Sequence, residues 1–261
     1  MRPGIPHLGD PSDRRVMETR LFGTTPVAAW EGCFPWLRAG TTRRTDIAGS
    51  RAEAAGPSAP GEKPDDVDLT LAASWRAVVR SRQVHGRAVR VHGAMPRGVS
   101  VTGEADGHAT GASGVLLTVT LADCVPVFIV DPPRRTVALL HAGWRGTAAG
   151  VVEAGLDTLS EVFASDPAEL LVHLGPAICG RCYEVGPEVF RALGEAVPVD
   201  PAPIDLRSVI RRQTIAAGVR REHVTVSDEC TLCGESRYFS HRRGDRGRHR
   251  GYIGMRESDD L

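Results

Sequence analysis

Residues 114–164 read GVLLTVTLADCVPVFIVDPPRRTVALLHAGWRGTAAGVVEAGLDTLSEVFA, and this stretch decides the fold class. It contains three apolar runs, at 114–123, 125–131 and 136–144, and we expect each of them to form a buried strand. The apolar spacing then changes to that of a helix over residues 147–164. Strands followed by a helix predict an α/β or α+β protein built as a layered sandwich.

The same pattern continues on both sides of this stretch. Upstream, residues 77–80 and 88–92 are short β-branched runs around a polar turn. Downstream, the sequence predicts strands at 169–175 and 224–229 and helices at 187–196 and 206–217, the second helix capped by Asp205. We therefore expect order to be concentrated from Leu71 onwards.

The domain organisation is predicted to be simple. No repeat or domain-sized linker interrupts the chain, so we expect a single domain over residues 21–261. Residues 1–20 are rich in proline, glycine and charge, and they are expected to lack fixed structure. Residues 48–68 have a similar composition and are expected to form a mobile surface loop.

The composition excludes several classes of function. The 261 residues include 32 Lys+Arg and 32 Asp+Glu, so no net field draws the chain to nucleic acid or to an anionic membrane. No apolar run approaches the length that spans a bilayer, and the N-terminal residues lack the apolar core of a secretory signal. Six cysteines in such a chain indicate thiols or metal ligands rather than disulfides, and the cytoplasm is the expected compartment.

Polar residues that carry chemistry fall where the predicted strands end. Two imidazoles and one thiolate are a suitable ligand set for zinc, and three protein ligands leave one position open for water or substrate. Taken singly, each of these residues is more often structural than catalytic, so the prediction of a zinc site rests on their conjunction. The three segments are RQVHG (82–86), LADCVP (121–126) and HAGWRG (141–146), and they contribute His85, Cys124 and His141.

The same residues allow two other chemistries. In a Cys–His hydrolase or transferase, Cys124 would be the nucleophile, His141 or His85 would activate it, and Asp123 or Gln83 would orient the imidazole. Metal dependence separates this scheme from zinc chemistry, because a chelator spares a thiol nucleophile. A multicopper oxidase is disfavoured, since none of the nine histidines forms a His-X-His pair. Copper remains an adventitious substitute for zinc at such a site.

The other cysteines include two CxxC pairs, Cys179 with Cys182 and Cys230 with Cys233. Two such pairs normally indicate a zinc site. Here 47 residues and two predicted helices separate the pairs, which is much longer than in a compact zinc ribbon. We therefore expect four buried or loop thiols rather than a second zinc.

Seven segments resemble, in order, the motifs of one family. That family is the laccase-domain or polyphenol oxidase family of YfiH-like proteins, which includes the bacterial peptidoglycan editing factor. The segments are RQVHG, EADGHAT (104–110), TLADCVPVFIVD (120–131), LLHAGWRGTAAGVV (139–152), LGPAICGRCYEVG (174–186), DECTLC (228–233) and RYFSHRRGDRGRHRG (237–251).

The resemblance implies a four-layer α/β/β/α sandwich with mixed sheets and a single zinc held by His85, Cys124 and His141. It further implies phosphorolysis of purine nucleosides (inosine, adenosine or methylthioadenosine) with inorganic phosphate, often together with adenosine deamination. A second role implied by the family is a hydrolase or amidase that edits UDP-linked peptidoglycan precursors.

Substrate contacts are expected from Arg43, Gln83, Asp123, Arg145 and Arg242. Arg43 closes a Gly-Thr-Thr-Arg segment that is similar to the family's Ser-Thr-Arg motif, although the family's following Gly-Gly and Ser-Leu-Asn-Leu-Gly stretch is not recognisable. Arg242 lies in a Phe-Ser-His-Arg-Arg segment that is similar to Phe-Ser-Tyr-Arg-Arg. Arg43 and Arg145 suit phosphate, because a guanidinium forms paired charge-assisted hydrogen bonds. Most other arginines between Arg237 and Arg250 are expected to lie in a solvated basic segment.

Overall fold

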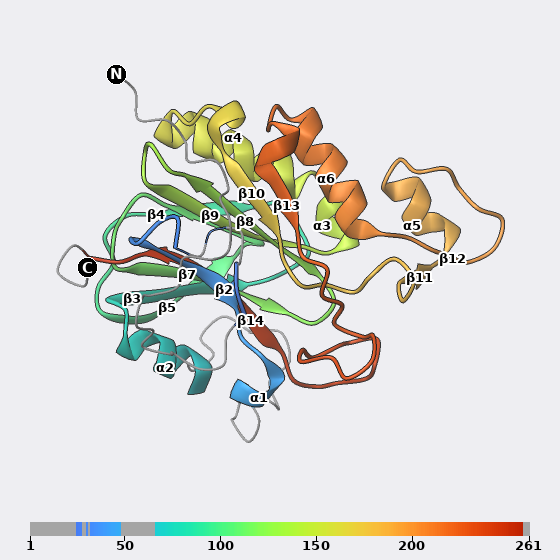
Figure 1. Cartoon of the computed structure of the whole chain (residues 1–261), viewed down its shortest axis with the longest axis horizontal. Helices are drawn as coiled ribbons and strands as arrows, with labels where there is room; N and C mark the ends of the chain where they lie inside the picture. The colour runs from blue at the N-terminus through green and yellow to red at the C-terminus, as the bar shows by residue number, and fades with distance from the viewer. Residues whose placement is uncertain (1–24, 28–29, 31, 48–65, 258–261) are drawn as a thin grey trace.

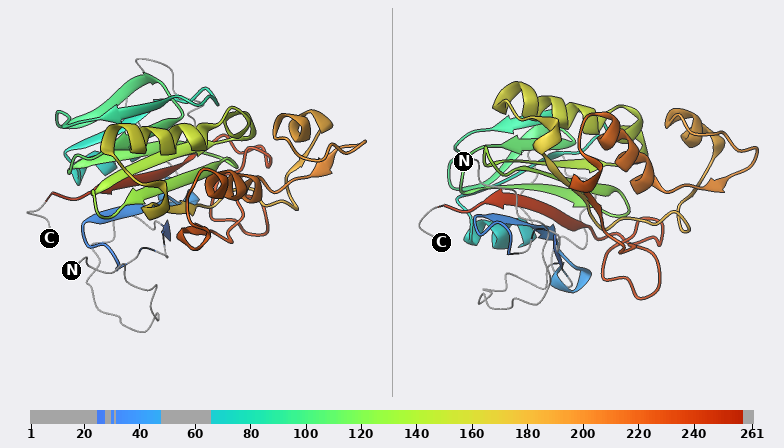
Figure 2. Two further views of the ribbon diagram at one scale, coloured as in Figure 1. Left: turned by 90° about the horizontal axis from the view of Figure 1, so that it is seen from above. Right: turned by 45° about the horizontal axis from the view of Figure 1, so that its top comes forward.

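A computed structural model of the protein describes residues 25–27, 30, 32–47 and 66–257. Two six-stranded sheets pack face to face, and helices cover their outer faces (Figures 1 and 2). In spatial order the first sheet contains β1 (Thr25–Pro26), β2 (Leu37–Thr41), β14 (His249–Met255), β7 (Val115–Leu121), β3 (Ala77–Arg82) and β5 (Gly98–Glu104). The second contains β13 (Val224–Val226), β10 (Leu171–Leu174), β8 (Val125–Asp131), β9 (Thr136–Ala142), β6 (Gly107–Thr110) and β4 (Val89–His92).

The helices complete four layers. The helix α2 (Asp66–Ala73) lies against β3 and β5 of the first sheet, whereas α4 (Val151–Phe163) and α6 (Leu206–Ala216) cover the second sheet. The shorter elements are α1 (Arg44–Ile47), α3 (Trp144–Ala148), α5 (Pro187–Ala192), the small ribbon β11 (Glu184–Val185) with β12 (Ala202–Pro203), and two 3₁₀ turns at Pro167–Glu169 and Arg221–His223. The predicted α/β/β/α sandwich with mixed sheets is confirmed.

The central strands are apolar without alternation because both of their faces are buried. On β8, Val127 and Ile129 pack toward the helices, whereas Phe128 and Val130 pack between the two sheets. A third cluster between the first sheet and α2 contains Leu71, Trp75, Val78, Leu116 and Phe239. Each layer boundary therefore has its own hydrophobic core.

Most elements predicted from the central stretch are present. The strands β7, β8 and β9 lie within their predicted ranges, and the Asp205 carboxylate caps α6 by accepting the N–H of Arg207 at 3.2 Å. The single helix predicted over 147–164 is wrong in one respect. Gly150 has a left-handed backbone (φ +83°) that ends α3 and starts α4 in a new direction.

The Arg-rich C-terminal segment differs from its expectation. Residues 249–255 form β14, which lies in the first sheet between β2 and β7. Arg250 is buried there, and its Nε lies 3.5 Å from the carboxylate of Asp68, which also pairs with Arg80 at 3.0 Å. The prediction of a solvated basic segment is therefore wrong for Arg250, which is buried and pairs with a buried carboxylate.

Two expected flexible segments fall mainly outside the described residues. These are residues 1–20 and residues 48–65. Residues 66–68 were also expected in the second loop, but they form the first turn of α2. Order also begins before Leu71, since β2 is an interior strand of the first sheet. Within the described part of the chain, no helix is both long and apolar enough to cross a membrane.

One edge of the sandwich collects several strand ends. β3 runs parallel to β7, and β2 is also parallel to β7 because both are antiparallel to the β14 strand between them. Their C-terminal ends therefore lie at the same edge of the first sheet. The chain crosses from that sheet to the second one at residues 122–124, which join β7 to β8. The candidate site lies at this crossing.

Candidate metal centre

Three residues far apart in the sequence converge at the crossing between the sheets. The ligand atoms of His85, Cys124 and His141 all lie within 4.8 Å of one another. His85 follows β3 of the first sheet, and His141 lies near the end of β9 in the second sheet, where it pairs in register with Pro126 of β8. The two imidazole rings are 4.9 Å apart at an interplanar angle of 75°.

The backbone around this cluster is strained. His85 and Asp123 have φ values of +58° and +84°, which lie in the left-handed region that residues other than glycine rarely adopt. At Gly143 it is the absence of a side chain that makes room for the cluster. A Cβ atom on Gly143 would lie 2.9 Å from Cys124 Sγ and 3.0 Å from His85 Cδ2, so only glycine leaves room for both side chains. The strain and the close approach both serve to bring ligand atoms together.

Asp106 holds two of the three candidate ligands in place. Its buried carboxylate accepts the backbone N–H groups of Val84, His85 and Gly86 at 3.1, 2.9 and 2.7 Å. It also lies 2.9 Å from His141 Nδ1, which must carry the hydrogen because an ionised carboxylate only accepts. Nε2 of His141 is thus left as the nitrogen with a free lone pair, which is how ligand histidines are oriented in metal proteins.

The electrostatics of the cluster favour a cation. Burial opposes ionisation of Asp106, but hydrogen bonds from His141 and from the loop amides outweigh it, so its pKa is lowered. Burial also opposes ionisation of Cys124, yet the His141 charge and the approach of both imidazoles lower the thiol pKa. The pKa of His141 is raised in turn, because the charges of Cys124 and Asp106 outweigh burial. A site that stabilises positive charge on His141 also stabilises a metal cation between His141 and Cys124.

The donor set fits a tetrahedral metal. Two imidazole nitrogens and one thiolate sulfur are ligands that zinc accepts, and three protein ligands match the catalytic rather than the structural arrangement. The structure therefore brings together three side chains that could hold a metal ion.

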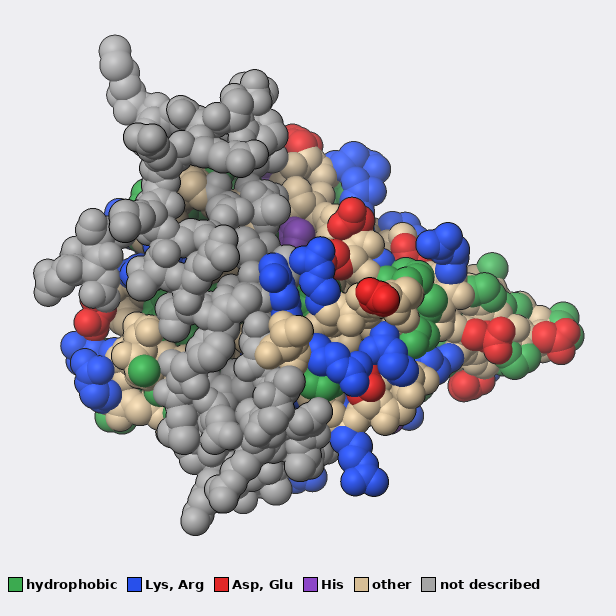
Figure 3. Space-filling model, turned by 60° about the horizontal axis from the view of Figure 1, so that its bottom comes forward, with side chains coloured by type: hydrophobic (Ala, Val, Ile, Leu, Met, Phe, Trp, Pro, Cys, Tyr) green, Lys and Arg blue, Asp and Glu red, His purple; other side chains and the backbone are tan. Residues whose placement is uncertain are grey.

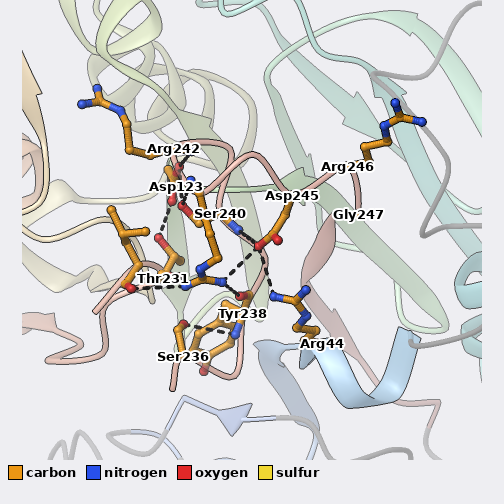
Figure 4. A network of polar contacts seen from close by, with 12 residues as sticks. Arg44, Asp123, Thr231, Ser236, Tyr238, Ser240, Arg242, Asp245, Arg246 and Gly247 are labelled. Carbon is orange, nitrogen blue, oxygen red and sulfur yellow. Dashed lines mark hydrogen bonds and ion pairs between the residues drawn. The ribbon is translucent and has the colours of Figure 1, made fainter. Parts of the chain in front are cut away.

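Asp123 connects the cluster to the C-terminal loop. Its carboxylate accepts hydrogen bonds from Thr231 Oγ1 at 2.6 Å, from Ser240 Oγ at 3.0 Å and from the Arg242 backbone N–H at 2.8 Å (Figure 4). A second carboxylate, that of Asp245, accepts the Ser240 N–H and pairs with Arg44 and Arg243 in the same network. The side chain of Asp123 thus organises the loop beside Cys124.

Two of the expected arginines, Arg145 and Arg242, lie near Tyr183. The pKa of Tyr183 is raised to about 12, first by burial and then by the nearby Cys124 charge, with Arg242 and Arg145 acting in the opposite direction. The Arg242 guanidinium lies 5.3 Å from the Tyr183 ring and donates to the Glu184 carbonyl at 2.9 Å. Arg145 is exposed and lies 4.3 Å from the Trp144 ring. Tyr183 therefore lies within electrostatic reach of Cys124, Arg242 and Arg145, and a substrate contact by either arginine stays a prediction.

The two other expected contacts have different positions. Arg43 is half-buried and follows β2, so it leaves the first sheet at the same edge as Asp123. The Gln83 side chain is bound to Thr120: its amide donates to the Thr120 carbonyl at 2.9 Å and accepts the Thr120 N–H at 2.6 Å. This pairing fastens the His85 loop to β7. A substrate contact by either residue stays a prediction.

Comparison with known proteins shows the family. The sequence profile of the multi-copper polyphenol oxidoreductase laccase family matches residues 65–256. The chain belongs to this family. It is 38% identical over 210 residues to "Purine nucleoside phosphorylase YlmD" of Geobacillus stearothermophilus, covering 71% of this chain and 76% of the relative. It is 33% identical over 199 residues to "Adenosine deaminase RL5" from an unknown prokaryotic organism, covering 68% and 76%.

A solved structure from the family has the same fold. The crystal structure of the hypothetical protein YfiH from Bacillus licheniformis superimposes with a TM-score of 0.74 at 25% sequence identity, covering 89% of this chain and 96% of that one. The resemblance inferred from the seven motifs is thereby confirmed. The laccase-family relatives named above carry nucleoside activities in their names, which makes the chain similar to enzymes.

Two residues of the site were not singled out by sequence reasoning, although both lie in laccase-family motifs. Asp106 belongs to EADGHAT, and Tyr183 belongs to LGPAICGRCYEVG. Asp106 has no ligand role of its own, since it acts on His85 and His141 through hydrogen bonds. An acidic residue inside a family motif and between two predicted strands is the signal in the sequence that could have identified Asp106.

The two CxxC pairs come together in the structure. The four sulfur atoms of Cys179, Cys182, Cys230 and Cys233 lie within 4.8 Å of one another and form a second cluster. All four are free and half-buried, and the expectation that they are thiols rather than ligands of a second zinc stays a prediction.

Proposed function

We propose that the chain is a zinc-dependent purine nucleoside phosphorylase that acts on inosine, adenosine or methylthioadenosine with inorganic phosphate. The observation that supports it most is the open cluster of His85, Cys124 and His141, in a chain 38% identical to a relative named purine nucleoside phosphorylase. Zinc bound there supplies a Lewis acid that polarises a substrate oxygen. Copper would bind the same donors, but as an adventitious substitute.

The chain's own residues are suited to phosphorolysis. Phosphate must attack the anomeric carbon of the nucleoside while the purine leaves, and the transition state gains positive charge on the sugar. Arg145 and Arg242 act electrostatically on Tyr183, which the Cys124 charge also reaches, and Arg43 follows β2 at the same edge of the first sheet. In the proposal these guanidinium groups hold the phosphate by paired charge-assisted hydrogen bonds. They fix its position for attack on the anomeric carbon, which lowers the entropic part of the barrier.

The surface around the C-terminal loop is consistent with an anionic substrate. Basic side chains gather on the face that Figure 3 presents, beside the projecting part of the molecule. They are arginines, because Lys63 is the chain's one lysine and lies outside the described residues. Arg237, Arg242, Arg243 and Arg246 are exposed members of this loop. In the proposal these arginines attract phosphate toward the open cluster.

Tyr183 supplies a hydrogen-bond donor in the proposed site. With a pKa of about 12, its phenol stays protonated at neutral pH, so it donates to an anionic or lone-pair oxygen or nitrogen. Asp123 keeps the Arg242 backbone next to Cys124. Together these contacts orient the substrate between the open cluster and the arginines.

Adenosine deamination is a second candidate activity of the same site. The observation that favours it is the 33% identity to a relative named adenosine deaminase. The open cluster serves both reactions in the proposal, since each needs an activated oxygen next to a bound purine nucleoside. The products separate them, because deamination releases ammonia and phosphorolysis releases the free base.

A Cys–His hydrolase or amidase that edits UDP-linked peptidoglycan precursors is the alternative. It is favoured by the Cys124–His141 pair, in which the thiol pKa is lowered and the imidazole pKa is raised. This is the charge distribution of an activated thiolate nucleophile. The cytoplasm is the proposed compartment for either function, because none of the described cysteines is in a disulfide.

The test is product analysis with zinc-loaded protein. Inosine is incubated with and without inorganic phosphate, and hypoxanthine is measured by chromatography. We expect release that requires phosphate and yields ribose 1-phosphate in equal amount. Release of equal amounts of hypoxanthine without phosphate would contradict phosphorolysis. Hydrolysis of a serine-containing UDP-linked precursor, with no nucleoside turnover, would support the editing alternative instead.

A further inference from the structure

The second cysteine cluster lies outside the candidate active site. Its closest sulfur atoms are those of Cys182 and Cys233 at 3.3 Å and of Cys179 and Cys233 at 3.6 Å. All four cysteines are half-buried, and none is in a disulfide. Four sulfur atoms at these separations, gathered from two distant segments, require a physical explanation.

The topology of the second sheet explains how the pairs meet. β10 and β13 are adjacent parallel strands, with Val172 opposite Val224 and Leu174 opposite Val226. Their C-terminal ends lie at the same edge, and the connection between them carries α5 and α6. Cys179 comes five residues after the end of β10, and Cys230 comes four residues after the end of β13. The pairing continues beyond the strands, because Ala177 bridges Cys230 and its carbonyl accepts the Thr231 N–H at 3.2 Å.

The separations are close to those that a tetrahedral metal requires. A Zn–S bond of 2.3 Å in a tetrahedron places neighbouring sulfur atoms about 3.8 Å apart. The backbone also fixes the position of one sulfur. Cys230 Sγ accepts the N–H groups of Cys179, Leu232 and Cys233 at 3.3, 3.4 and 3.4 Å. Hydrogen bonds from backbone groups to a metal-binding sulfur are typical of the surroundings that orient ligands.

We propose that Cys179, Cys182, Cys230 and Cys233 bind a second, structural zinc ion. Four thiolates are a soft ligand set that selects zinc among the divalent metals with tetrahedral preference. Four protein ligands complete the coordination shell, so no position is left for a substrate. The site is therefore structural, and it does not depend on the proposed phosphorylase activity.

The zinc would fasten two loops that form the wall of the open cluster. One loop carries Tyr183 directly after Cys182, and its Ile178 N–H donates to the Asp123 carbonyl at 3.1 Å. The other carries Thr231, whose hydroxyl donates to the Asp123 carboxylate at 2.6 Å. Loss of this zinc would loosen the surroundings of Asp123 and Tyr183. It would not remove any ligand of the open cluster.

The test is the zinc content of purified protein, measured by mass spectrometry of the native chain and by elemental analysis. Wild type is expected to hold two zinc ions per chain. The double variant Cys182→Ser/Cys233→Ser should hold one zinc ion, because it loses the ion of the four-cysteine site. Cys124→Ala should also hold one, because it loses the ion bound by His85, Cys124 and His141. Cys33→Ser is the matched control, because exposed Cys33 belongs to neither cluster, and it should keep two.

A second measurement needs no variant. Wild-type protein is alkylated before and after chelation, and the modified peptides are identified by mass spectrometry. The proposal expects the four cysteines to be protected before chelation and alkylated afterwards, and the midpoint of thermal unfolding to fall by more than about 5 °C after zinc removal. The double variant, if it folds, should show a similar fall.

Three results would overturn the proposal. One is a zinc content that is equal in wild type and the double variant. Another is protection by disulfides, seen as fewer than six alkylated thiols in unreduced, denatured, chelated protein. The third is iron instead of zinc in protein purified from a medium containing both metals. A single zinc lost only in the double variant would support this site and count against occupancy of the open cluster, so the two failures are distinguishable.

Discussion

The two cysteine-containing clusters differ in how many ligands they have and in how the chain brings them together. His85, Cys124 and His141 come from both sheets and offer three donors, whereas the four cysteines come from two loops at one edge of the second sheet. The backbone differs as well. Among the described residues, His85 and Asp123 are strained at the first cluster, whereas the second has a left-handed glycine, Gly234, directly after Cys233.

In our two proposals this difference separates a catalytic cluster from a structural one. The open cluster accepts strain at residues other than glycine and leaves a coordination position unfilled, and both features are typical of functional sites. The four-cysteine cluster has a complete donor set and hydrogen-bonded sulfur. Asp123 lies between the two clusters. Its carbonyl and carboxylate accept hydrogen bonds from both loops of the four-cysteine cluster, which we call the closed cluster. The closed cluster thus supports the wall of the open one.

The largest expected effect comes from removing the sulfur of the open cluster. Cys124→Ala should lower the rate of nucleoside turnover on the order of 10³-fold or more, because one of three ligands is lost. The protein should keep its fold and the zinc of the closed cluster. Steady-state kinetics and zinc analysis of the same preparation measure both effects. Full activity in this variant would remove the distinction between the clusters.

A smaller effect is expected at the residue that orients the ligands. Asp106→Asn removes the charge that holds His141 Nδ1 and three loop amides, so zinc affinity at the open cluster should fall about 10- to 100-fold. Competition with a chromogenic chelator measures this affinity. Asp131→Asn is the control, because Asp131 is equally buried but bonds to Arg134 at the other end of β8. Equal losses in both variants would indicate a general effect of buried charge.

Crowding the open cluster should have a weaker effect. Gly143→Ala places a methyl group 2.9 Å from Cys124 Sγ, and the resulting shift of the ligands should reduce turnover about tenfold. The melting temperature should fall by a few degrees. Gly93→Ala is the matched control, since a Cβ at Gly93 meets nothing within 4 Å. Unchanged kinetics in Gly143→Ala would show that the ligands have room to move.

The smallest effect concerns buried histidines outside both clusters. Burial lowers the pKa of His108, His173 and His249 to about 3, 4 and 3, whereas the pKa of His141 is raised. With a lowered pKa, the unfolded state binds protons below pH 6.5 while the folded state stays neutral, so stability falls as the pH drops toward 3–4. From pH 7.5 to 5.5 one such histidine costs about 1.4 kcal/mol.

Urea unfolding at pH 7.5 and pH 5.5 measures whether the free energy of unfolding falls at the lower pH. His249→Phe removes one of the three groups and preserves the ring packing against Tyr238, so its stability should depend less on pH than that of wild type by about 1 kcal/mol. A pH dependence equal to that of wild type would show that His249 is protonated in the folded state.

The sequence predicts the open cluster better than the closed one for a physical reason. His85, Cys124 and His141 lie in segments near the ends of predicted strands, and strand ends at one edge of a sandwich are neighbours. The closed cluster depends on β10 and β13 being adjacent and parallel. A crossover with α5 and α6 makes a spacing of 47 residues compatible with a compact site, and the order of strands in a sheet is not readable from spacing.

The missed strand β14 has a similar cause. Its segment, His249 to Met255, contains arginine, histidine and two glycines, so neither period nor composition indicates a buried strand. Buried Arg250 pairs with Asp68 of α2, which lies 182 residues earlier in the sequence. Local patterns predict the apolar central strands, whereas polar interior positions depend on partners that only the fold brings together.

The most direct test of the proposed chemistry is the metal dependence of phosphate-dependent hypoxanthine release from inosine. Protein is stripped with a chelator until the zinc of the open cluster is lost, and zinc is then restored in stepwise amounts while the rate is followed. The account predicts negligible release from the stripped protein and recovery in proportion to zinc bound by His85, Cys124 and His141. Undiminished release from protein shown to lack that zinc would contradict it.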